Sequence, residues 1–121
     1  MFRIRAIHGN AFFLSRNRLE QVRSIFRQTF PSHADYADKL ESLLHDPVRH
    51  GYRATLLVAE GASGRVDAFA LVLFFESVRS AFLDFVGTRP EAQSRGYGGA
   101  LYEATREYCG RLGAKALYLD V

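Results

Sequence analysis

The sequence predicts an α+β fold of layered (α/β) architecture around a mixed sheet, with its elements in the order β-α-α-β-β-β-α-β. Two observations predict this fold. Apolar residues recur at helical spacing in the first half of the chain, and continuous apolar runs typical of buried strands follow from residue 53. In addition, the last three elements have the length expected of a right-handed parallel strand–helix–strand crossover.

The first half of the chain is expected to form one strand and two helices. Residues 2–7 alternate between apolar and arginine side chains, which is typical of a short amphipathic strand. Asn17, with Glu20 three residues later, matches a capping box, and the helix that follows ends at Pro31. Apolar residues at helical spacing predict a second helix over 34–45.

The second half is expected to supply most of the sheet. Residues 54–59 and 66–75 are apolar runs joined by a turn of small residues, so they predict an antiparallel hairpin. A third strand is expected over 81–86. A helix from about residue 100 to residue 112 and a final strand over 116–121 complete the pattern.

The length of 121 residues favours a single domain, residues 1–121, and 48% apolar with 24% charged residues excludes disordered and fibrous classes. No apolar run approaches the roughly 18 residues of a membrane span, and no signal-peptide pattern begins the chain. We therefore expect a cytoplasmic protein with no membrane partner. The single cysteine, Cys109, excludes an internal disulfide.

The formal net charge is +3, and fourteen of the sixteen basic residues are arginine. They are scattered along the chain, so no nucleic-acid partner is expected. Such a charge suits an anionic small ligand, for example a phosphorylated cofactor. An arginine-rich composition that is unrelated to any ligand explains the charge equally well. No metal site is expected, because metal-ligand spacing is absent around the histidines His8, His33, His45 and His50.

A glycine-rich segment, residues 93–100, lies between a predicted strand and a predicted helix. Glycines there allow a sharp turn with N–H groups pointing outward, and the helix adds its unpaired N–H groups and the positive end of its dipole. This arrangement predicts an anion site, to which Arg95 adds a charge. The segment is not a P-loop, since it lacks the Lys-Ser or Lys-Thr pair, and Leu101 stands where a dinucleotide motif beginning at Gly96 needs glycine.

The spacing of this segment resembles the core motif of the GCN5-related N-acetyltransferase (GNAT) family, (Gln/Arg)-x-x-Gly-x-(Gly/Ala). Gln93, Gly96 and Gly98 match it. The preceding residues 84–91 and the following residues 113–119 are also similar to the family's flanking strands. The resemblance covers nearly the whole chain.

The resemblance implies an N-acyltransferase that moves an acetyl or acyl group from acetyl-CoA to an amine by direct attack. It also implies a sheet whose parallel strands splay around the cofactor. Motif amides would bind the CoA pyrophosphate, and the strand before the motif would bind the pantetheine arm, with the Val86 amide polarising the thioester carbonyl. The implied cofactor-binding residues are Val86, Thr88, Gln93, Ser94, Arg95, Gly96, Tyr97, Gly98 and Gly99.

Asp84 and Glu76 are the candidate catalytic residues, because both are carboxylates close to this region in the sequence. Asp84 lies two residues before Val86, so in a regular strand both point to the same face, where Asp84 could relay a proton. The alternative is that Asp84 faces solvent on a half-exposed strand. Glu76 is explained more simply as the end of a strand.

The chain departs from the family pattern after its last strand, where the family continues with a helix and two strands that carry a general-acid tyrosine. Three interpretations follow: a fragment of a longer protein, a sheet completed by a homodimer or another chain, or a non-catalytic CoA-binding or regulatory module. The sequence does not specify the acceptor amine.

Overall fold

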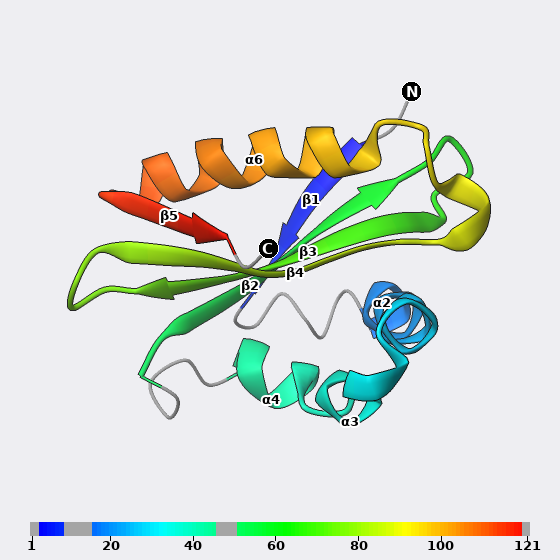
Figure 1. Ribbon diagram of the computed structural model, residues 1–121, viewed down its shortest axis with the longest axis horizontal. Coiled ribbons are helices and arrows are strands. Elements are labelled where there is room, and N and C mark those ends of the chain that lie inside the picture. The colour runs from blue at the N-terminus through cyan, green and yellow to red at the C-terminus, as the bar shows by residue number, and fades with distance from the viewer. Residues whose placement is uncertain (1–2, 9–15, 46–50, 120–121) are drawn as a thin grey trace.

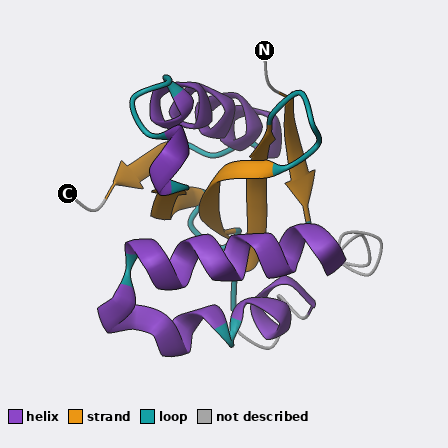
Figure 2. Ribbon diagram, turned by 90° about the vertical axis from the view of Figure 1, so that its right-hand side faces the viewer, coloured by secondary structure: helices purple, strands orange, loops and turns teal. Residues whose placement is uncertain are grey.

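The computed structural model describes residues 3–8, 16–45 and 51–119. A sheet separates two helical layers, with α6 on one face and α2, α3 and α4 on the other (Figure 1, Figure 2). The elements are β1 (Arg3–Ile7), α2 (Arg16–Thr29), η1 (Pro31–His33), α3 (Ala34–Ala37), α4 (Leu40–His45), β2 (Arg53–Glu60), β3 (Val66–Phe75), β4 (Ser80–Thr88), η2 (Pro90–Ala92), α6 (Tyr97–Leu112) and β5 (Ala116–Leu119).

The sheet has five strands in the order β1-β2-β3-β4-β5. The pairs from β1 to β4 are antiparallel, whereas β4 and β5 are parallel and joined through α6. The mixed sheet, the β2–β3 hairpin and the parallel crossover are therefore confirmed. β5 pairs with β4 only over Ser80–Leu83. The expected end of the last strand, residues 120–121, lies outside the described residues.

Two predicted helix starts are wrong. Asn17 lies inside α2 instead of capping it, and Glu20 pairs with Arg23 on the helix surface. The amphipathic face of α2, which packs on the sheet, sets the helix bounds more strongly than the local capping pattern. α6 begins at Tyr97, earlier than expected, because Gly96 adopts the left-handed conformation (φ 85°) and serves as the N-cap.

The helix expected over 34–45 is divided into α3 and α4. Between them, the N–H groups of Asp38 and Lys39 donate to the carbonyls of Asp35 and Tyr36, three residues earlier, at 3.2 and 3.0 Å. This tight turn changes the direction of the chain, so that Leu40 is buried in the core that also contains the apolar face of α2. The apolar periodicity predicted the helical conformation of this segment, but such a pattern does not show where a helix is interrupted.

Each face of the sheet carries its own core. Phe26 of α2 and Phe69 of β3 are fully buried on one face, and Leu101 of α6 packs over Ala70 on the other. β3 is central and covered on both faces, which explains its unbroken apolar sequence. Within residues 3–8, 16–45 and 51–119 no helix is long and apolar enough to cross a membrane.

A β-bulge in β4 changes the direction of its side chains. Leu83 pairs with Val72 and Phe85 pairs with Leu71, so Asp84 is an extra residue without an opposite partner. Leu83 and Val86 therefore pack on the α6 side, while Phe85 packs on the α2 side. The expectation that Asp84 and Val86 share a face is wrong, because the bulge between them breaks the alternation of a regular strand.

Substitution of Gly87 tests this packing. A Cβ at Gly87 would lie 2.7 Å from Cε1 of the buried Phe69 ring, whereas a Cβ at Gly110 on α6 would meet nothing within 4 Å. We expect Gly87→Ala to lower the free energy of unfolding by about 1–3 kcal/mol through overpacking. Gly110→Ala, the control, should raise it by up to about 1 kcal/mol. Chemical denaturation measures both, and an unchanged value for Gly87→Ala would contradict the contact.

Candidate functional site

The segment between β4 and α6 presents backbone N–H groups to solvent. Ser94 and Gly96 both have positive φ (67° and 85°), which turns the chain sharply into the helix. The first hydrogen bond of α6 runs from the Ala100 N–H to the Gly96 carbonyl at 3.1 Å, so the N–H groups of Gly98 and Gly99 have no acceptor within the helix. Both glycines are exposed, and a Cβ on either would meet nothing within 4 Å. The geometry suits an anion at the positive end of the helix.

A buried carboxylate, Asp67 of β3, holds this segment in place. The Tyr97 hydroxyl donates to Asp67 Oδ2 at 2.9 Å, and Arg65 Nε donates to Oδ1 at 3.1 Å. The backbone N–H of Arg89 donates to the Asp67 carbonyl at 2.7 Å. The first residue of α6 and the last residue before η2 are thus fastened to the same strand.

Among the predicted cofactor-binding residues, Tyr97 differs in its placement. Its side chain is buried against Asp67, so only its backbone faces the turn. Burial and the Asp67 carboxylate raise the pKa of Tyr97, so the phenol remains a donor. The side chains of Gln93, Ser94 and Arg95 are exposed, and Arg95 lines a pocket of about 560 Å³ beside the β2–β3 turn.

One edge of β4 is open beyond the bulge. In the described residues the pairing with β5 ends at Leu83, whereas pairing with β3 continues to Thr88. Since the Arg89 N–H points to β3, alternation along an antiparallel strand directs the N–H groups of Val86 and Thr88 to the opposite, open edge. An extended ligand could add there by β-type hydrogen bonds.

A pocket of about 500 Å³ lies along the same part of β4. Its lining combines apolar side chains with two titratable groups, Asp84 and His33. The remaining lining residues are Phe30, Leu83, Phe85, Val86 and Leu119. A largely apolar cavity with few polar groups is typical of a small-molecule site.

Asp84 in this pocket is oriented by a tyrosine from the helical layer. The Tyr36 hydroxyl of α3 donates to Asp84 Oδ2 at 2.9 Å. Burial, followed by the charge and hydrogen bond of Asp84, raises the pKa of Tyr36 well above its ordinary value. The pKa of Tyr52 is raised by burial and then by Asp84. Tyr36 therefore keeps its proton, while Asp84 Oδ1 has no partner among the described residues.

The sequence model of the acetyltransferase (GNAT) family matches residues 19–121. The chain belongs to this family. Acetyl-CoA is accordingly its co-substrate, and acetyl transfer to amines is the chemistry that the family supports. No curated protein matches the sequence.

Solved GNAT structures share the fold. Tetrahymena GCN5 is 18% identical with a TM-score of 0.80, covering 98% of this chain and 70% of its own. The aminoglycoside N-acetyltransferase AAC(6')-Iy in complex with CoA is 20% identical with a TM-score of 0.73, covering 100% and 77%. The ribosomal-protein-alanine N-acetyltransferase of Brucella melitensis is 16% identical with a TM-score of 0.70, covering 99% and 79%.

The GNAT fold separates the two carboxylates that the sequence offered as catalytic. Asp84 is half-buried in the pocket, on the other face from the one expected, with Oδ2 bonded to Tyr36. Glu76 lies in the turn after β3, where it is exposed and accepts a hydrogen bond from Arg53 Nη2 at 2.6 Å. Glu76 is not among the residues that line the pocket.

Sequence reasoning missed Tyr36 and Asp67 as residues of the candidate site. Tyr36 lies in the second helix expected over 34–45, and nothing local in the sequence connects it to a strand residue 48 positions later. Asp67 carried a usable signal, because it is a single carboxylate inside the apolar run of β3. A charged side chain in such a run is buried at a cost unless it is paired, so it indicates a specific partner.

Removal of the Tyr97 hydroxyl tests whether Asp67 fixes the turn. We expect Tyr97→Phe to lower the free energy of unfolding by about 1–3 kcal/mol, because a buried carboxylate oxygen loses its donor. Tyr102→Phe on the same helix is the control, since the Tyr102 hydroxyl has no hydrogen-bond partner among the described residues. Equal unfolding free energies for the two variants in urea would contradict the role of Asp67.

Proposed function

We propose that this chain is an enzyme that transfers an acetyl group from acetyl-CoA to a small or peptidic amine, with Asp84 receiving the amine proton. One observation carries the proposal. An anion-binding turn, an open strand edge and a pocket with an oriented carboxylate follow one another along β4. This order matches the pyrophosphate, the pantetheine arm and the thioester of one CoA molecule.

The cofactor would be held mainly by the backbone. The N–H groups between Ser94 and Gly99 would bind the pyrophosphate, with Arg95 beside them and Gln93 at the start of the turn. Val86, through its carbonyl, and Thr88, through its N–H group, would hydrogen-bond the pantetheine arm at the open edge. We further propose residues 1–121 as one acyl-CoA-binding domain, since a single sheet supports both cores.

The reaction requires one nucleophilic attack and one proton acceptor. The lone pair of a neutral amine attacks the thioester carbonyl carbon, and the C–S bond breaks with its electron pair leaving on sulfur. The amine nitrogen releases a proton, for which Asp84 Oδ1 is the acceptor, while the Tyr36 hydroxyl fixes Oδ2. The Val86 N–H would stabilise the negative charge that develops on the carbonyl oxygen.

Blocking the turn tests cofactor binding. Gly98→Trp places a bulky side chain over the exposed N–H groups without a clash at its Cβ, so we expect CoA affinity to fall at least about a hundredfold. Gly110→Trp is the matched control, because it alters another exposed glycine of the same helix with an equally open Cβ. Isothermal titration measures both, and a change within twofold for Gly98→Trp would contradict the assignment.

Replacing the carboxylate tests the chemistry. The amide of Asp84→Asn keeps an oxygen for Tyr36 but cannot accept the proton, so we expect kcat to fall about a hundredfold or more with CoA affinity unchanged. Asp38→Asn is the control, because Asp38 is an exposed carboxylate paired with Arg27 outside the pocket. Thiol release from acetyl-CoA with a panel of amines gives the rate. A loss on Glu76→Gln with none on Asp84→Asn would contradict the assignment.

The same panel separates catalysis from binding alone. A protein that binds acetyl-CoA and releases no thiol with peptide N-termini, lysine side chains, polyamines or aminoglycosides would be a non-catalytic CoA-binding or regulatory module. That outcome would contradict the proposed transfer and leave the cofactor assignment standing. The chain's own pocket selects no single amine, so the panel must cover several classes.

A further inference from the structure

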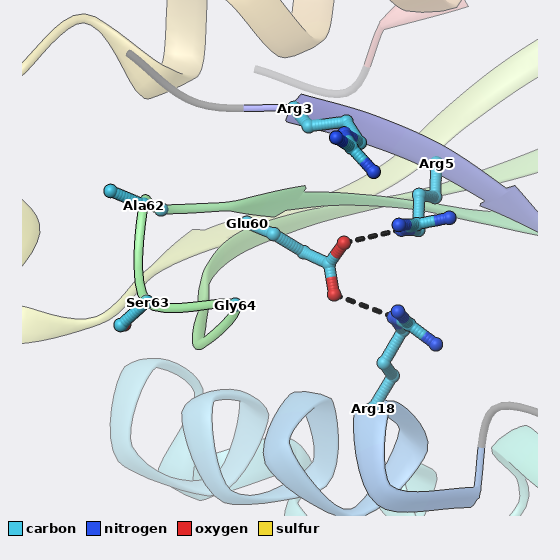
Figure 3. Close-up of a pocket in the computed structure, with 8 residues that line it drawn as sticks. Arg3, Arg5, Arg18, Glu60, Ala62, Ser63 and Gly64 are labelled. Atoms are coloured by element: carbon cyan, nitrogen blue, oxygen red, sulfur yellow. Dashed lines mark hydrogen bonds and ion pairs between the residues drawn. The ribbon is translucent and has the colours of Figure 1, made fainter.

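A third pocket, of about 600 Å³, lies where β1 begins, beside the β2–β3 turn. Figure 3 shows Arg5 and Arg18 meeting the Glu60 carboxylate from β1 and α2, with Arg3 extending from β1 toward the same space. Gly61, Ala62, Ser63 and Gly64 form its other wall. None of these residues belongs to the Asp84 pocket, but Gly61, Ala62 and Ser63 also line the neighbouring pocket that contains Arg95.

Glu60 brings two like charges together. Its side chain is buried, and its two oxygens accept separately from Arg5 Nε and from Arg18 Nε, the latter at 2.6 Å. Burial alone would raise the pKa of Glu60, but the hydrogen bonds from Arg18 and Arg5 outweigh it and lower the pKa. Glu60 is therefore ionised, and one carboxylate fixes two guanidinium groups in adjacent positions.

This arrangement leaves cationic donors unused. Arg5 and Arg18 contact Glu60 through Nε, so their terminal Nη groups have no partner among the described residues. Arg3 has no ion pair or hydrogen bond within the described residues either. Three guanidinium groups against one carboxylate leave two positive charges in the pocket.

We propose that this pocket binds a phosphate monoester of a small organic molecule. A phosphate monoester carries close to two negative charges at neutral pH and presents several oxygens, which matches the excess charge and the forked donors of arginine. Ala62 and Ser63 line the pocket, and their N–H groups have no acceptor among the described residues. The volume exceeds that of the anion alone and admits its organic part.

Arginine side-chain NMR can test the site directly. The Nε–Hε signals of Arg5 and Arg18 report on the pocket, while inorganic phosphate or phenyl phosphate replaces chloride at constant ionic strength. We expect saturable shifts of both signals. Arg3→Ala should weaken phosphate affinity about tenfold, which is equivalent to about 1.4 kcal/mol, because it removes a charged donor that has no partner among the described residues. Arg106→Ala, an exposed arginine on α6, should change affinity less than twofold.

Several results would overturn the site. Shifts that grow linearly without saturating, or equal effects of Arg3→Ala and Arg106→Ala, would indicate screening of surface charge instead of binding. Acetate binding as tightly as phosphate would overturn the choice of phosphate. The titration is repeated with saturating CoA: retained shifts support an independent site, and their loss would assign the pocket to CoA. Unchanged urea denaturation of Arg3→Ala excludes a folding defect.

Discussion

The extra residue in β4 is the constraint on which the site depends. Both faces of the sheet are covered by helices, so the buried residues of the central strands must fit one of two cores. The bulge at Asp84 reverses the alternation and places Phe85 against Phe26, with ring centroids 4.7 Å apart. Without it, Phe85 would point to the α6 side. The aromatic packing of Phe85 therefore holds the bulge, and the bulge leaves Asp84 unpaired in the ladder and free to meet Tyr36.

A second buried carboxylate connects this strand to the turn that follows it. Asp67 accepts from Tyr97 at the start of α6, and its carbonyl accepts from Arg89 at the end of β4. The position of the exposed N–H groups is thus set by a side chain near the start of the central strand, β3. Stability and ligand geometry are coupled here, because the contacts that fix the turn are buried while the turn itself is open to solvent.

Features determined by local chemistry were predictable from the sequence. The apolar run of β3 and the glycine turn before α6 follow from neighbouring residues, and the structure has both. The bulge was not predictable, because it depends on which residues of β3 and β4 are opposite each other. The Tyr36–Asp84 contact has the same cause, since it joins residues 48 apart. The capping pattern at Asn17 predicted the wrong helix start. Local hydrogen bonding there contributes less than the packing of the amphipathic helix on the sheet.

In the proposed site, backbone groups bind the cofactor and side chains line the pocket for the amine. The cofactor contacts proposed here are almost all N–H groups, which any residue compatible with the turn and strand can supply. Such a site needs only a few glycines in place and leaves the identity of most other residues unrestricted. The Asp84 pocket is the opposite case, because its lining from Phe30 and His33 consists of side chains on the helical layer. The choice of amine is therefore expected to depend on η1 and its neighbours, while the chemistry of the thioester depends on β4.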